Sequence, residues 1–174
     1  MKHRAPNPVT KVILKYVTLS FPSLESPEVF DSQIGKYAAT FLLDKDSTND
    51  SHASLTECVR RLLNGKPFVI DDSKNCVKDG DLAQYDDYYN KWSVKASCKD
   101  EPIIVDQKKA AMSASDLYAG CKVNAIIDLW LQDNKYGRRI NANLYAVQFV
   151  AHGAPIGNGQ TLASTENILE DLPF

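Results

Sequence analysis

At 174 residues and 44% hydrophobic composition, the chain can bury one substantial core, which favours one folded domain over two. Its formal net charge of -2 argues against a uniformly basic nucleic-acid binder. The first residues lack the apolar run of a signal peptide, and no stretch approaches membrane-spanning length. We therefore expect a cytoplasmic protein without a membrane partner.

The first predicted elements are two strands and a helix. Residues 11–21 and 36–43 are rich in β-branched and aromatic side chains, and the prolines between them break regular structure. Residues 51–64 carry apolar side chains at helical spacing. These side chains are Leu55, Val59, Leu62 and Leu63. Asp50 or Ser51 is expected to cap the start of this helix, and Asn64-Gly65 is expected to close it.

Residues 91–99 alternate between the two faces of a predicted strand. One face is apolar and carries Trp92, Val94, Ala96 and Cys98. The other face carries Lys91, Lys95 and Lys99. We expect Trp92 to lie in the core. The lysine face is either a solvated strand face or a surface for a polyanion.

A long antiparallel hairpin is predicted over residues 121–150. Residues 121–132 alternate in polarity, and Asn134 and Gly137 supply turn chemistry before the next strand at 140–150. Trp130 falls on the polar face, where it either packs under a loop or stays open to a ligand. With a short strand at 102–105 and a helical turn near 113–120, the elements predict a mainly β, small antiparallel barrel or sandwich.

Charge is unevenly distributed along this nearly neutral chain. Arg139 is the last basic residue, and only Glu166, Glu170 and Asp171 add formal charge beyond it. We place the folded domain at residues 1–157 and expect a disordered acidic segment at 158–174. A body with basic clusters and a separate acidic segment differs from an acidic globule.

Basic clusters with neighbouring aromatic residues predict binding of single-stranded nucleic acid, which needs cations for phosphates and ring faces for bases. The aromatic candidates are Tyr85, Tyr88, Tyr89, Trp130 and Tyr136. The basic candidates are Lys91, Lys95, Lys99, Lys122, Lys135, Arg138 and Arg139. Each of these residues also has an ordinary structural interpretation, as a solvated or core side chain.

No catalytic motif or metal-ligand spacing is present in the sequence, so we expect no enzyme activity, no cofactor and no metal. The four cysteines form no C-x-x-C pair and are expected to be reduced and mostly buried. The acid-rich stretch 71–89 does not match a calcium loop and is expected to be a solvated loop. A nuclease using Asp71, Asp72, Asp79 and Asp81 remains an alternative.

Several short motifs resemble those of the tailed-phage single-stranded-DNA-binding proteins long described as a domain of unknown function. The most specific are "LSFPSL" at 19–24, "LYAGC" at 117–121 and "VQFV" at 147–150, supported by "DGD" at 79–81. The resemblance implies an OB-fold-like β-barrel with added elements, which binds single strands with little sequence preference in phage DNA replication or recombination. The predicted helix follows the second strand, whereas an OB helix usually follows the third.

The acidic segment resembles a second pattern, the acidic tails of bacterial and phage single-strand binders. "EDLPF" at 170–174 fits that pattern, and the expected partner-binding residues are Glu166, Glu170, Asp171, Pro173 and Phe174. A phenylalanine beside acids on a tether can enter an apolar pocket ringed by Arg or Lys. The expected partners are phage or host replication proteins, and self-association on DNA is possible. An alternative is a non-enzymatic virion or assembly β-protein that docks through the same segment.

Overall fold

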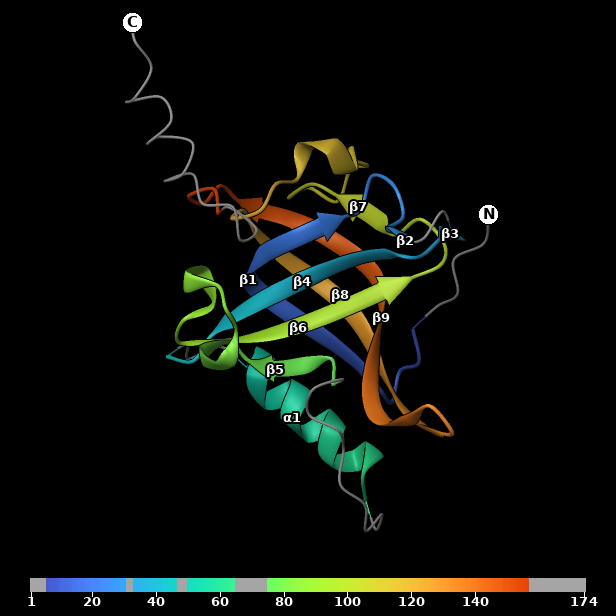
Figure 1. Ribbon diagram of the computed structural model, residues 1–174. Coiled ribbons are helices and arrows are strands. Elements are labelled where there is room, and N and C mark those ends of the chain that lie inside the picture. The colour runs from blue at the N-terminus through green and yellow to red at the C-terminus, as the bar shows by residue number, and fades with distance from the viewer. Residues whose placement is uncertain (1–5, 31–32, 47–49, 65–74, 157–174) are drawn as a thin grey trace, which may run out of the picture.

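We describe the fold from a computed structural model, in which residues 6–30, 33–46, 50–64 and 75–156 are described (Figure 1). The strands are β1 (Lys11–Ser23), β2 (Val29–Phe30), β3 (Gln33–Ile34), β4 (Tyr37–Asp44), β5 (Val77–Asp79), β6 (Lys91–Cys98), β7 (Ile103–Val105), β8 (Lys122–Asn134) and β9 (Gly137–Ala151). The helix α1 spans Ser51–Leu62, and three 3-10 turns are η1 (Gly80–Leu82), η2 (Asp86–Tyr88) and η3 (Ala114–Asp116).

The long strands close into the predicted OB-fold-like barrel. The sheet order is β5-β6-β4-β1-β8-β9-β7, and β6 also pairs with β9. That closing contact is parallel and joins Ser97 to Asn143, whereas the other barrel pairings are antiparallel. The ring β1-β4-β6-β9-β8 therefore has no open edge, and β5 and β7 extend it on either side.

The core fills the inside of this barrel. On β8 buried side chains alternate with more exposed ones, as the polarity pattern predicts, whereas β4 is buried along nearly its whole length. The largest fully buried members include Leu14, Leu19, Phe41, Ile127, Leu129 and Ile140. Trp92 packs against this core but is only half-buried, so its expected core position is reached in part.

Helix α1 covers one end of the barrel, where it contacts β1 and β8 (Figure 1). Along the chain it follows β4, the second barrel strand, as the sequence predicted. Leu55 is buried against β1, and the other predicted apolar residues of this face are half-buried. Asp50 occupies the N-cap position without a side-chain cap bond, and the helix ends at Leu62, before the expected Asn64-Gly65. The Oγ of Ser51 instead accepts a hydrogen bond from the Lys15 backbone N–H at 2.8 Å, which ties the helix to β1.

Two β-bulges bend β1 along the barrel. The pairing registers shift between Leu14 and Val17 and between Ser20 and Ser23. Within these shifts Tyr16 has a φ of 53° and Phe21 a φ of 43°, values that non-glycine residues rarely adopt. Each bulge therefore interrupts the strand's alternation and changes the direction of the side chain within it, Tyr16 in the first and Phe21 in the second.

The motif at 117–121 has a steric explanation. Gly120 has a φ of +111°, and a Cβ there would lie 2.1 Å from the carbonyl oxygen of Ala154. Only glycine fits this position, because a side chain would push the segment after β9 off the barrel.

Within the described residues, no helix is long and apolar enough to cross a membrane.

Candidate nucleic-acid interface

A groove of about 1270 Å³ crosses the outer face of the barrel. Its lining comes from β4, β5, β6, β8, β9, the bulge of β1 and the segment 82–88. Of the residues predicted to contact DNA, the structure brings five together in this groove: Tyr85, Tyr88, Lys95, Trp130 and Arg139. They come from three separate segments of the sequence, which are the stretch 71–89, the strand at 91–99 and the hairpin at 121–150, so the barrel fold is what unites them.

The basic side chains of the groove are suited to phosphate. The Lys95 side chain is 59% exposed and approaches Glu28 at 3.8 Å, a distance that leaves the ammonium largely hydrated. Arg139 Nε donates to Gln132 Oε1 at 3.0 Å, which fixes the guanidinium at the groove. Lys36 and Lys78 also line the groove, and both are exposed. Sequence reasoning missed these two, because neither lies in an obvious cluster.

Gln132 lies two residues after Trp130, so the alternation of residues 121–132 puts it on the same polar face, yet it is buried. It is 8% exposed, because its amide is fully used inside the hairpin. Its Oε1 accepts from Arg139 and from Asn141 Nδ2 at 2.9 Å, and its Nε2 donates to Asn134 Oδ1 at 3.1 Å. Gln132 therefore lines the groove with little exposed surface and holds the neighbouring side chains Arg139 and Asn141 in place.

An aromatic cluster forms one wall of the groove. The ring centroids of Phe21 and Tyr85 lie 5.3 Å apart, and those of Tyr85 and Tyr88 lie 5.2 Å apart. Tyr88 is buried, and its hydroxyl shares a 2.9 Å hydrogen bond with Ser20 Oγ. Burial raises the pKa of Tyr88. Tyr85 is 39% exposed, so it is the member whose ring remains open to a ligand.

Phe21 is a groove residue that periodicity did not single out. Its position depends on the β1 bulge, which no local alternation of polarity reveals. The signal that could have found it was the motif "LSFPSL", which contains it.

The two tryptophans have different surroundings. The ring of Trp92 stacks on His52 at 4.9 Å and 9°, and Lys45 Nζ lies 4.6 Å from the centroid of the same ring. Burial lowers the pKa of His52, so this stack carries a neutral imidazole at neutral pH. Trp130 is 41% exposed on β8 and lines the groove. Trp92 also lines the groove, but its ring is half-buried and contacts His52 and Lys45, so Trp130 is the tryptophan with the more open ring.

The other predicted DNA-binding residues lie outside the groove lining. Lys91 forms an ion pair with Asp44, and Lys99 is exposed just after β6. Lys122 donates to Thr18 Oγ1 at 2.6 Å and lies near the Tyr16 ring. Four further predicted residues are exposed but do not line the groove: Tyr89, Lys135, Tyr136 and Arg138. Their contact with DNA stays a prediction from the sequence, and the groove makes the opposite prediction for Tyr89, Tyr136 and Arg138, which do not line it.

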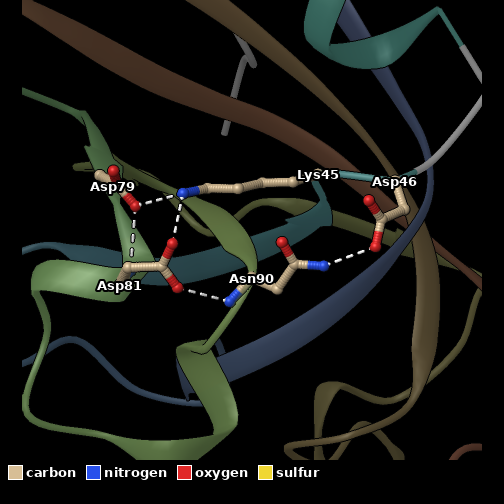
Figure 2. A network of polar contacts seen from close by, with 5 residues as sticks. All are labelled: Lys45, Asp46, Asp79, Asp81 and Asn90. Carbon is tan, nitrogen blue, oxygen red and sulfur yellow. Dashed lines mark hydrogen bonds and ion pairs between the residues drawn. The ribbon is translucent and has the colours of Figure 1, made fainter.

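Two acids of the proposed nuclease set take part in an ion-pair network. Lys45 Nζ lies 2.5 Å from Asp79 Oδ1 and 2.7 Å from Asp81 Oδ2 (Figure 2). Hydrogen bonds from Lys45 lower the pKa of both carboxyl groups, and the same bonds raise the pKa of Lys45. Asp71 and Asp72 lie outside the described residues. Within the described ranges, no group of three or more His, Cys, Asp or Glu side chains could hold a metal ion.

The cysteines match the expectation of free thiols. All four are unpaired, three of them are buried, and Cys98 is half-buried. Burial raises the pKa of Cys76 to about 12 and that of Cys98 to about 11. Such thiols are protonated at neutral pH and are therefore weak nucleophiles and weak metal ligands.

The predicted acidic segment, with its five partner-binding residues, lies outside the described part of the chain.

Comparisons with known proteins identify the family of the chain. Residues 10–170 match the family model described as Enterobacter phage Enc34, ssDNA-binding protein. Protein p50 of Acyrthosiphon pisum secondary endosymbiont phage 1 is 30% identical over 175 residues, which cover 93% of this chain and 94% of that protein.

Solved structures show the same fold. The single-stranded DNA-binding protein of bacteriophage Enc34 in complex with ssDNA superposes with a TM-score of 0.77 at 26% identity, over 90% of this chain and 97% of that one. The single-stranded DNA-binding protein of bacteriophage T7 shares the fold, with a TM-score of 0.60 at 13% identity, over 83% and 93% of the two chains. The chain belongs to the family of the Enterobacter phage Enc34 single-stranded-DNA-binding protein.

Proposed function

We propose that this protein binds single-stranded DNA in the groove, with little preference for sequence. The observation that carries the proposal is the meeting of Lys95, Arg139 and the exposed ring of Trp130 in one groove. Cations that follow the phosphate backbone and rings that stack on bases are the two requirements for such binding. The Enc34 relative, whose structure contains ssDNA, supports the assignment.

The chemistry of the groove explains why sequence should matter little. Every base offers a π-face, so Trp130 and Tyr85 can stack on any of them, at about 1 to 3 kcal/mol per base. Lys95 and Arg139 meet phosphates, which carry no sequence information. Binding should therefore depend strongly on salt and weakly on base composition.

The biological role we infer is non-enzymatic coating of single strands during phage DNA replication or recombination. In this role the acidic segment recruits phage or host replication proteins through Glu166, Glu170, Asp171, Pro173 and Phe174. Acids beside an aromatic residue suit a basic, apolar pocket on such a partner. Neighbouring copies on one strand are a further candidate contact.

The proposal is tested by titrating the purified protein onto unstructured oligo-dT and onto duplex DNA at several salt concentrations. We expect saturable binding to oligo-dT, with log K falling by roughly 0.7 per neutralised phosphate for each unit of log salt. An affinity that does not change with salt contradicts the groove mechanism. No affinity at all would favour the virion or assembly alternative, and magnesium-dependent cleavage of the oligonucleotide would favour the nuclease.

A further inference from the structure

We propose that Lys45, Asp79 and Asp81 form a latch that positions the aromatic loop, defined here as residues 80–89, for base stacking. The inference rests on the proposed function and concerns how one wall of the groove is held. Its consequence is counterintuitive, because two carboxylates near a DNA groove then strengthen DNA binding.

The latch joins the residue after β4 to the junction of β5 and η1, which follows more than 30 residues later in the chain (Figure 2). Lys45 directly follows β4, Asp79 is the last residue of β5, and Asp81 lies in η1. The ammonium bridges both carboxylates, and Asp79 Oδ1 also accepts the Asp81 backbone N–H at 3.0 Å. One lysine thus fixes the point where the aromatic loop leaves β5.

The other end of the loop returns to the same place. Asn90, which has a φ of 57°, donates its backbone N–H to Asp81 Oδ1 at 2.7 Å. Its carbonyl accepts the Lys45 backbone N–H at 3.0 Å, and its side chain donates to Asp46 at 2.6 Å. Both ends of the loop are therefore held by the segment that follows β4, as Figure 2 shows.

The loop between these ends is folded back tightly on itself. A Cβ on Gly80 would lie 2.2 Å from the carbonyl oxygen of Tyr88 and 2.5 Å from that of Lys91. This contact leaves Tyr88 buried against Ser20 and Tyr85 exposed at the groove. The latch holds Tyr85 in place before DNA arrives, so binding does not have to order the loop.

Simple electrostatics makes the opposite prediction for the acids. Asp79 lines the groove, and Asp81 lies beside it on the same latch, so their charges oppose phosphate. Neutralising either one should then tighten DNA binding. If the latch governs, neutralisation loosens the aromatic loop and weakens binding instead. The sign of the effect separates the two mechanisms.

The experiment compares Asp81→Asn with Asp86→Asn on the full chain. Asp86 is exposed on the same loop and lies outside the latch, so its change removes the same charge and serves as the matched control. We expect Asp81→Asn to weaken oligo-dT binding roughly three- to tenfold, and Asp86→Asn to leave it unchanged or slightly tighter. Hydrogen exchange of loop amides should accelerate only in Asp81→Asn.

A second probe separates stacking from charge. An abasic oligonucleotide of equal length has the same phosphates but no bases, so its affinity should not fall in Asp81→Asn. Asp79→Asn provides an independent variant should Asp81→Asn lose its fold, and Lys45→Arg should retain most of the binding because it keeps the bridging charge.

Two outcomes overturn the proposal. The latch is wrong if the folded Asp81→Asn or Asp79→Asn protein binds oligo-dT as tightly as Asp86→Asn, or if abasic and oligo-dT affinities fall equally. If the unaltered protein does not bind oligo-dT in the same titration, the proposed function itself fails.

Discussion

Replacing Trp130 with alanine should weaken single-strand binding without removing a charge. The ring is 41% exposed at the groove, and loss of one stacked base costs about 1 to 3 kcal/mol, or about 5- to 150-fold in affinity. The salt slope should not change, because no phosphate contact is lost. Tyr136→Ala is the matched control, since Tyr136 lies on the same hairpin, is 65% exposed and does not line the groove.

Stability has to be measured alongside affinity. With about three-fifths of a surface of up to about 250 Å² covered, the ring contributes at most about 4 kcal/mol to the free energy of unfolding. Circular dichroism at low temperature should therefore confirm that Trp130→Ala is folded before it is titrated.

Fluorescence gives a second readout of the same prediction. The chain has two tryptophans, and His52 and Lys45 cover the ring of Trp92. Trp92 also lines the groove, but its ring is half-buried, so most of the quenching on addition of oligo-dT should come from Trp130. The quenching should fall strongly in Trp130→Phe and persist in Trp92→Phe. A folded Trp130→Ala protein with unchanged affinity, or quenching of undiminished size in Trp130→Phe, would refute the stacking role.

Three further predictions follow from the same structure. Arg139→Ala should reduce the salt slope by roughly 0.7, whereas Arg138→Ala, which lies outside the groove, should not; equal slopes in a salt titration would contradict the groove assignment. Burial raises the pKa of Cys76 to about 12 and that of Cys98 to about 11, so iodoacetamide should label both thiols slowly in the native protein at neutral pH and quickly after denaturation. Fast labelling of the native protein, measured by mass spectrometry, would contradict this. Deleting residues 164–174 should tighten oligo-dT binding several-fold at low salt and less at high salt, because the tethered acids compete with phosphate; an unchanged low-salt affinity would exclude that competition.

The strands could be predicted from the sequence where one face of the strand is buried and the other is exposed to solvent. The alternation in β6 and β8 and the turn chemistry at Asn134 and Gly137 gave their positions within a few residues. The parallel contact between Ser97 and Asn143, which closes the barrel, joins residues far apart in sequence and leaves no local signal. The short strand β5 was also missed, because three residues in an acid-rich stretch carry too little pattern.

The site was predictable where a residue's face follows from alternation. Lys95 and Trp130 lie in the groove for that reason. Arg138 and Arg139 are adjacent and chemically alike, yet they point to different faces of β9, and sequence clustering could not separate them. Phe21 reaches the groove through a bulge, and Gln132 is covered by its own hydrogen bonds, so tertiary structure decided both.

Ultraviolet cross-linking of the full-length protein to oligo-dT, with the attached peptides mapped by mass spectrometry, tests the central claim most directly. The groove predicts cross-links at Trp130 and Tyr85, both suppressed by high salt as the strand dissociates. Cross-links confined to Tyr16, Tyr89 or Tyr136, which are exposed but lie outside the groove, would contradict the account.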